Sequence, residues 1–391
     1  PNREQMLLNA TVTLLHLGKT DDSLSTLNAS SDPTMRSRFI VEARDYGTDP
    51  AILLSAAAQH SDPSVRQATL LALGTYHPQE ISPVTKQQGF MLLENLLRQG
   101  RFASERSAAE FLVRKWGDQP AIDKIHTELA APVTAIKDHL RTHNWWVNSK
   151  SQVMCVINPP LQFTAGSPID EFMREDIEVQ CDVNIPYRFA VAAHEVSIKD
   201  YEQFRELTDL SFENTDDTNL PVNKVSIVQA MQYCRWLSEE DGVSEDQMCF
   251  PPVDDIKIED AFLTDEKLRR TGYRLLTEHE WEGVCRAAST TAWFTGNDSK
   301  ALNHFAWAFP ESQGSPNSIG ALMPNAWGFF DMAGNMLEWC HPSQGRQDFA
   351  QRGGNFKQSA SNFRSARRYS QTGERYSYNG FRIARTLPPV D

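Results

Sequence analysis

The sequence predicts a multidomain protein, with an all-α helical solenoid over residues 1–140 followed by an α+β domain of low regular secondary structure over residues 145–391. The first observation is length, because 391 residues are more than one typical core organises. The second is a change of pattern near Trp145, where apolar residues spaced three and four apart give way to short β-type runs and turns. The third is charge, which is nearly balanced before residue 140 and strongly uneven after it.

Four N-terminal segments are typical of short amphipathic helices. Each carries apolar residues at helical spacing, and most end close to a glycine, which favours a helix C-terminus. The segments are MLLNATVTLLHLG, TMRSRFIVEARDYG, SVRQATLLALGTY and SERSAAEFLVRKWG.

An element that ends in arginine recurs at the start of three of these helices. It is DPTMR at Arg36, DPSVR at Arg66 and FASER at Arg106. An aspartate or serine caps a helix, proline suits its first turn, and an inward arginine can bind the turn of the neighbouring repeat. The pattern resembles HEAT-like repeats, which implies a small solenoid that serves as a scaffold or binds a partner.

The net charge of −13 is concentrated in the middle of the chain. Residues 141–340 hold 15 Lys and Arg against 32 Asp and Glu, whereas residues 341–391 hold 9 against 3. The overall sign argues against a general nucleic-acid binder. We expect the basic C-terminal segment either to contact an anionic group or to pair with the acidic middle of the chain.

The compartment is left open by the sequence. The chain has no apolar run near twenty residues and no signal peptide, which predicts no membrane span in it. Its start at Pro1, in what resembles a first helical turn, predicts a soluble piece of a larger bacterial protein, either cytoplasmic or extracytoplasmic. The six cysteines show no C-x-x-C pair and no zinc spacing, and we expect reduced, buried thiols.

His139 and His143 stand four residues apart in DHLRTHNWW, so a helix would place both imidazoles on one face. The spacing resembles the H-x3-H-x-E element of iron-dependent sulfoxide synthases, but Trp145 stands at the glutamate position. A metal-dependent oxidase or sulfoxide-synthase-like enzyme is therefore one hypothesis. The alternative is a pair of histidines at a solvated helix end without a metal.

Within the second domain, TEHEWEGVCRAA carries the pattern of a helix N-terminus. Thr277 and Glu280 are expected to form a capping box. In it the Thr277 hydroxyl accepts from the backbone N–H of Glu280, and the Glu280 carboxylate accepts from the backbone N–H of Thr277. The spacing of Trp281, Val284 and Cys285 then predicts the buried stripe of that helix.

Eight segments follow one another in order after about residue 150: LQFTAGSP, HEVSIKDYEQF, PVNKVSIVQAMQYCRWLS, GYRLLTEHEWEGVCRAA, PNAWGFFDMAGNMLEWC, RGGNF, RSARR and NGFRIAR. Together they resemble the formylglycine-generating enzyme, or sulfatase-modifying factor, family. The resemblance covers about residues 150–388. It implies a compact α+β fold related to C-type lectins.

Enzymes of that family oxidise a substrate cysteine to formylglycine, using copper held by two of their own cysteines shortly after a double glycine. Here Gly353 and Gly354 match the double glycine, Gln358 stands at the first cysteine position, and no cysteine follows Cys340. Cu(I) requires soft thiolate ligands. The comparison therefore predicts no copper, no formylglycine chemistry and no catalytic residues for that reaction.

The resemblance also implies a calcium site in DMAGNMLEW, with ligand positions Asp331, Gly334, Met336 and Glu338. Two side-chain oxygens and two backbone carbonyls would contribute, which suits a hard cation. The alternative is that Glu338 pairs with an arginine and the loop closes without a metal.

The stretch from 353 to 379 is predicted to be a ligand-binding groove, because its arginines match positions that line the substrate groove of the family. Arginine suits carboxylates and backbone carbonyls, while neutral amides and tyrosines add hydrogen bonds and contact area. The alternative is that single arginines are buried partners of the acidic middle segment. The predicted site residues are Asn355, Gln358, Asn362, Arg364, Arg367, Arg368, Tyr369 and Tyr376.

Three function classes follow from these features. The favoured one is a non-catalytic binding or regulatory module, a degenerate formylglycine-generating-enzyme domain joined to HEAT-like repeats within a bacterial signalling protein. Its partner would be a protein or peptide, held by the basic C-terminal groove, by the helical repeats, or by both. A retroelement-diversified ligand-binding protein is the second class, because such proteins use the same lectin-like fold. The metal-dependent enzyme is the third.

Overall fold

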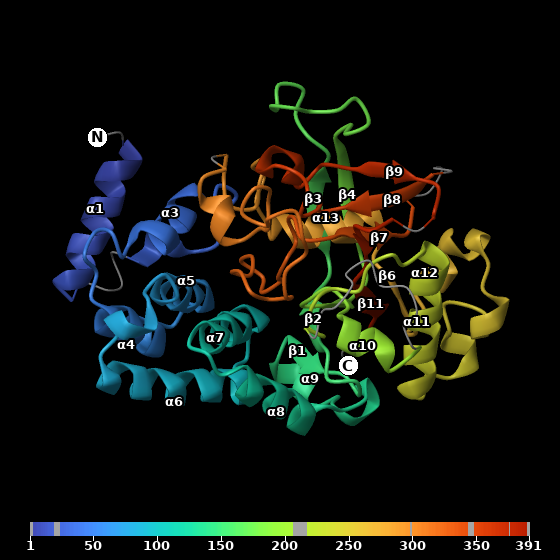
Figure 1. Ribbon diagram of the computed structural model, residues 1–391, viewed down its shortest axis with the longest axis horizontal. Coiled ribbons are helices and arrows are strands. Elements are labelled where there is room, and N and C mark those ends of the chain that lie inside the picture. Colours follow the sequence, from blue (N-terminus) through green and yellow to red (C-terminus); the bar gives the residue numbers. More distant parts are fainter. Residues whose placement is uncertain are drawn as a thin grey trace.

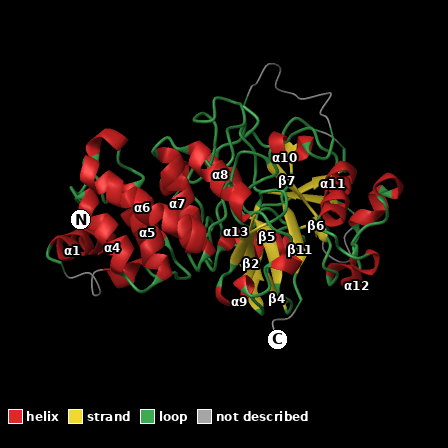
Figure 2. Cartoon of the chain, turned by 90° about the horizontal axis from the view of Figure 1, so that it is seen from below, coloured by secondary structure: helices red, strands yellow, loops and turns green. Residues whose placement is uncertain are grey.

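Helices gather at one end of the molecule and strands at the other. The computed structural model places the helical region first in the chain and an α+β domain after it, which confirms the predicted fold class (Figure 1). Figure 2 shows the strands confined to one half of the molecule together with several later helices, whereas the N-terminal helices fill the other half. The structure describes residues 3–18, 24–205, 217–297, 299–342, 348–374 and 376–388.

The N-terminal region consists of helices that pack side by side, which is consistent with helical repeats. Asp49, Asp62, Ser82 and Asp118 cap four of them, each accepting a hydrogen bond from a backbone N–H of the first turn, and proline follows in that turn. In the described part of the chain, no helix has both the length and the apolar character needed to cross a bilayer. The helices are α1 (Arg3–His16), α3 (Thr34–Glu42), α4 (Pro50–Gln59), α5 (Pro63–Leu73), α6 (Pro83–Gln99), α7 (Ala103–Lys115), α8 (Gln119–Leu129) and α9 (His139–Thr142).

The recurring arginines join one helical unit to the next. The buried Arg36 guanidinium donates to the carbonyls of Leu27 and Ser64 at 2.6 Å each, and Ser64 lies in the first turn of α5. Arg66 donates to the carbonyl of Ala57 at 2.8 Å and approaches Glu105 in α7 at 3.0 Å. The expectation that an inward arginine binds a neighbouring unit is thus confirmed at both positions.

A five-stranded antiparallel sheet forms the centre of the second domain, in the order β1-β2-β5-β11-β6. Every residue of β2 and β5 is buried, because helices and loops cover the sheet. Helix α11 packs against β6, and the short helices α10 and α12 lie nearby in the chain. The elements are β1 (Trp145–Val147), β2 (Val153–Ile157), β5 (Phe189–Ala192), α10 (Ile198–Glu202), α11 (Ile227–Glu240), α12 (Asp265–Leu268), β6 (Tyr273–Leu275) and β11 (Ile383–Thr386).

A second sheet, in the order β10-β7-β8-β9, carries the C-terminal stretch of interest. Helix α13 packs against β8 and against the separate β3–β4 hairpin. Its capping box between Thr277 and Glu280 is confirmed, and Trp281, Val284 and Cys285 are buried as predicted. The bounds are β3 (Leu161–Ala165), β4 (Cys181–Ile185), α13 (Glu278–Arg286), β7 (Leu337–Cys340), β8 (Phe349–Arg352), β9 (Tyr369–Gln371) and β10 (Asn379–Gly380).

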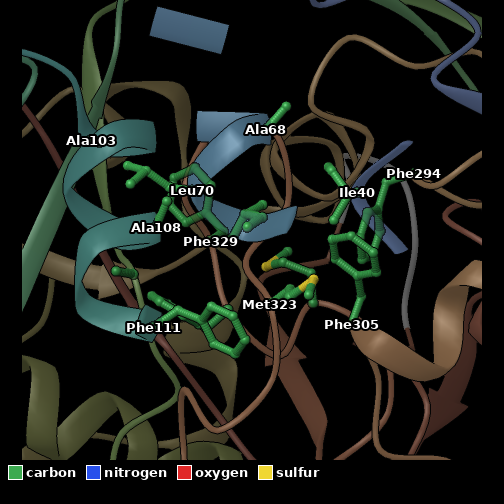
Figure 3. Close-up of a cluster of buried hydrophobic side chains, with 14 of the residues drawn as sticks. Ile40, Ala68, Leu70, Ala103, Ala108, Phe111, Phe294, Phe305, Met323 and Phe329 are labelled. Atoms are coloured by element: carbon green, nitrogen blue, oxygen red, sulfur yellow. The ribbon is translucent and has the colours of Figure 1, made fainter. Parts of the chain in front are cut away.

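One hydrophobic core runs through both regions. Figure 3 shows side chains of the helical region and of the second domain meeting in one cluster: Ile40, Leu70 and Phe111 on one side, and Phe294, Phe305, Met323 and Phe329 on the other. Hydrogen bonds also cross the boundary, from Gln67 to the Asn325 carbonyl at 2.9 Å and from Ser107 to the Gly328 carbonyl at 2.7 Å. The two regions therefore pack as one body, with apolar burial as the main stabilising term.

Candidate binding site

The double glycine turns the chain out of β8. Gly353 and Gly354 have φ of 96° and 80°, in the left-handed region that side chains disfavour. A Cβ on Gly354 would also overlap the ring of Phe363. Both glycines are therefore required by the backbone, and they place residues 355–363 against the edge of the second sheet.

Gln358 lies within a network of hydrogen bonds. Its Oε1 accepts from the backbone N–H of Asn355 at 3.1 Å and from the hydroxyl of Tyr369 at 3.2 Å. Phe363 is buried with 1% of its surface exposed. At Gln358, the position that the resemblance gives to the first copper-binding cysteine, an amide stands in place of a thiolate.

The cysteines near this stretch do not replace the missing pair. Cys285 lies 3.7 Å from the hydroxyl of Ser365, but burial raises the pKa of its thiol to about 12. Burial also raises the pKa of Cys340 well above its usual value. Because the thiolate is the metal ligand, these residues do not fit a copper–thiolate centre.

Arg364 is buried and paired within the chain. It donates to Glu178 at 2.6 and 2.7 Å, to Glu171 at 2.6 Å and to the carbonyl of Met173 at 2.6 Å. These partners lie in the connection between β3 and β4. At this position the structure matches the alternative expectation, a buried partner of the acidic middle segment, because a buried guanidinium needs a nearby carboxylate.

The other two arginines also have internal partners. Arg368, with 3% of its side chain exposed, donates to Glu278 and to Asp348 at 2.5 Å each. Arg367 is less buried; it pairs with Glu175 at 2.7 Å and lies over the ring of Tyr369 at 5.2 Å. The predicted groove is therefore not an open cationic surface, and only Arg367 presents its guanidinium near solvent.

The connection between β3 and β4, residues 166–180, is a feature that the sequence analysis missed. In Figure 1 this green segment extends away from the body of the molecule. Its apolar side chains point outward, with exposed fractions of 85% for Ile169, 71% for Phe172 and 45% for Met173. The mixture of apolar and acidic residues in IDEFMREDIEV was the available signal for an exposed segment. Apolar residues that alternate with so many charged ones cannot all be buried.

The neutral site residues fall into two groups. Tyr369 brings Gln358 and Asn362 together, because its hydroxyl also lies 3.4 Å from the Asn362 carbonyl. Asn355 is buried, and its side chain accepts from the N–H of Lys357. Tyr376 stacks on Tyr378 instead, with ring centroids 5.7 Å apart.

The predicted calcium loop is closed by internal contacts. Glu338 accepts from Arg382 at 2.6 and 2.7 Å and from the indole of Trp281 at 2.9 Å. Burial raises the pKa of Asp331 to about 6, and its carboxylate accepts from the N–H of Gly320. As the side chains lie, the set does not fit a calcium ion. Binding at Asp331, Gly334, Met336 and Glu338 stays a prediction that requires Glu338 to exchange Arg382 for the ion.

His139 and His143 stack face to face, with ring centroids 3.9 Å apart. Nε2 of His139 lies 2.9 Å from the carbonyl of Trp145, and Nδ1 of His143 lies 3.2 Å from the carbonyl of His139. A ring nitrogen that donates to a carbonyl carries a hydrogen, so a neutral His139 would have only Nδ1 to offer a metal. Within the described ranges, no cluster of three His, Cys, Asp or Glu side chains accompanies them.

Comparison with known proteins identifies the second domain. Residues 149–387 match the family model described as the sulfatase-modifying factor enzyme 1-like domain. Similar solved structures include Treponema denticola variable protein 1, with a TM-score of 0.52, 20% identity and coverage of 60% of this chain and 95% of that one. PvdO from Pseudomonas aeruginosa (TM-score 0.49, 22% identity, coverage 61% and 95%) and CarF (0.44, 16%, 60% and 98%) also match. At these identities the likeness concerns the fold alone, and no curated protein matches the chain significantly.

Proposed function

This chain belongs to the sulfatase-modifying factor enzyme 1-like family through residues 149–387, and we propose that its family domain binds a protein or peptide without generating formylglycine. The observation that carries the proposal is Gln358 at the position that the resemblance gives to the first copper-binding cysteine, with no cysteine after Cys340. An amide is not a soft ligand, and burial raises the pKa of the nearby Cys285 and Cys340 thiols. The domain keeps the fold of the family but not the groups that the reaction needs.

The proposed recognition face consists of Phe172, Met173, Asn362, Arg367 and Tyr369. Contacts within the chain join its two parts, since Arg364 binds the Met173 carbonyl and Arg367 pairs with Glu175 of the same connection. Exposed apolar side chains rimmed by polar groups are typical of protein interaction sites. Tyrosine and arginine add amphipathic contact area and bidentate hydrogen bonding. Such a face suits a peptide or protein that offers an apolar residue and backbone carbonyls.

The non-catalytic part of the proposal is tested with a cysteine-containing peptide from a sulfatase. We expect the cysteine to remain unmodified when the peptide is incubated with copper-loaded protein and oxygen and then analysed by mass spectrometry. An active formylglycine-generating enzyme serves as the positive control on the same peptide. Aldehyde formed by the unaltered chain would overturn the proposal.

The binding part is tested with two matched surface variants, Phe172→Ser and Met91→Ser. Both side chains are 71% exposed, but Phe172 lies in the recognition face and Met91 lies on α6 of the helical region. Burying a phenylalanine at an interface contributes about 1.5–3 kcal/mol, so we expect Phe172→Ser to weaken partner binding by about 10- to 100-fold.

The measurement is cross-linking capture from a bacterial lysate, followed by titration of the captured protein. Retention by Met91→Ser and loss by Phe172→Ser supports the recognition face. The reverse result would place the binding surface on the helical repeats instead. Thermal melting of both variants checks that neither change disturbs folding.

A further inference from the structure

A cavity of about 420 Å³ opens at one end of the central sheet, and none of the residues of the recognition face lines it. It lies where β5 begins and β11 ends, and the N–H of Leu387 donates to the carbonyl of Arg188 there at 2.9 Å. The segment before β1 and the turn after α11 complete its wall. Its volume is in the range of small-molecule sites in proteins.

The wall of this cavity is largely apolar. Leu140 and Leu387 are buried members of the second hydrophobic cluster, and Val133 packs against that cluster. Val243 and Pro388 also line the space. An apolar portion of a ligand would therefore replace water against these side chains, which is favourable.

The charged groups of the cavity are mostly cations. Lys137, Arg141, Arg188 and Arg385 line it, against the single carboxylate of Asp241. That carboxylate is already occupied, because it accepts from the Tyr273 hydroxyl at 2.7 Å, from Arg385 at 3.2 Å and from Ser149. Arg141 also has a partner, Asp138 at 3.2 Å, so Lys137 and Arg188 are the cations of this cavity for which the described residues show no ion pair.

Arg188 shows this imbalance most directly. Only 9% of the residue is exposed, and its guanidinium donates to the Asn158 side chain and to the Leu140 carbonyl at 3.1 Å each. Among the residues that the structure describes, no carboxylate forms an ion pair with it, and burial lowers its pKa. A buried cation with neutral partners alone is costly, and an anion in the cavity would remove that cost.

Arg385 is a second buried arginine in the wall of this cavity, with 2% of its surface exposed. Its charge is balanced, because it pairs with Asp241 at 3.2 Å, and its guanidinium lies 4.5 Å from the centre of the Tyr273 ring. Arg188 is therefore the buried arginine of this cavity for which the described residues supply no carboxylate.

We propose that this cavity binds a monocarboxylate with an apolar tail of medium length, its carboxylate facing Arg188 and its tail packed on Leu140, Val243 and Leu387. Arginine binds carboxylates through two parallel hydrogen bonds, and the apolar wall accommodates the tail. This site is separate from the recognition face and does not depend on the proposed function.

Isothermal titration with octanoate, and with octanol as the neutral analogue, tests the site on the full chain. We expect octanoate to bind the unaltered protein, and octanol to bind at least about tenfold more weakly, because a charge-assisted hydrogen bond is lost. Arg188→Gln should weaken octanoate binding by a similar factor. Arg98→Gln is the control, since Arg98 lies on α6 and pairs with Glu94 and Glu128.

Val243→Trp provides a second test that leaves every arginine in place and fills the cavity from a half-exposed position. Loss of octanoate binding in this variant, with unchanged melting, supports the site even where Arg188→Gln fails to fold. Equal octanoate binding by a folded Val243→Trp variant would overturn the proposal. So would equal affinities for octanoate and octanol, or no binding of octanoate to the unaltered protein.

Discussion

Replacing Glu110 by glutamine is expected to lower the free energy of unfolding by about 3–5 kcal/mol, because it leaves the guanidiniums of Arg106 and Arg114 without their shared carboxylate. Glu110 lies in α7 and is fully buried. Its oxygens approach Arg114 at 2.7 Å, Arg106 at 3.0 Å, His194 at 3.1 Å and His126 at 3.5 Å. Although burial alone would raise it, the pKa of Glu110 lies well below its usual value because His194 and His126 face the carboxylate.

Because His194 lies in the family domain, the loss of Glu110 is expected to destabilise both regions of the chain. His194 follows β5 in the family domain, whereas the other three partners lie in α7 and α8 of the helical region. Urea unfolding of Glu110→Gln is expected to show one transition at lower denaturant for both regions. The matched control is Glu94→Gln, whose exposed pair with Arg98 contributes no more than about 1 kcal/mol. Equal stability of the two variants would contradict a structural role for the buried cluster.

Replacing Arg364 by methionine is expected to lower the free energy of unfolding by a similar amount, about 3–5 kcal/mol, because it leaves two carboxylates without their cation. Glu178 and Glu171 both lose their cation, and Glu178 is fully buried while Glu171 is 8% exposed. Burial raises the pKa of Glu178, but the hydrogen bonds from Arg364 and Ser167 and the charge of Arg364 together lower that pKa overall. Without Arg364 we also expect residues 166–180 to become a site of rapid proteolysis, since the loop loses its main anchor.

Arg367→Met is the matched control for that change. Arg367 is three residues away and pairs with Glu175, whose side chain is 41% exposed. A partly exposed pair contributes about 1 kcal/mol or less. Limited proteolysis and urea unfolding, run in parallel on both variants, distinguish the two arginines. If both variants lost the same free energy of unfolding, burial of the Arg364 ion pairs would make no additional contribution to stability.

Local patterns in the sequence were sufficient where neighbours in the chain determine the structure. The capping box of Thr277 and Glu280 and the buried stripe beside it lie within one helix, so spacing alone predicted them. The turn-binding role of Arg36 followed from a motif repeated about thirty residues later. The order of the family segments predicted the second domain, and the match over residues 149–387 confirms it.

Contacts between distant segments were beyond those patterns. The sequence shows Arg364 as one of several C-terminal cations, but its partner Glu178 lies 186 residues earlier. Nothing in spacing or charge tells which of the cations is buried against that loop and which, like Arg367, reaches solvent. The same reason applies to Glu110, whose neighbour His194 comes from another domain, and to the cavity beside Arg188.

The continuous core between the helical region and the family domain has a consequence for any partner that touches both. A hinge would let two binding surfaces adjust to one another, but a shared interior holds them at one distance and one angle. Affinity gained by engaging both surfaces then depends on whether the partner's own two contact points match that spacing. A partner that contacts both regions would therefore have to match their fixed spacing as well as their chemistry.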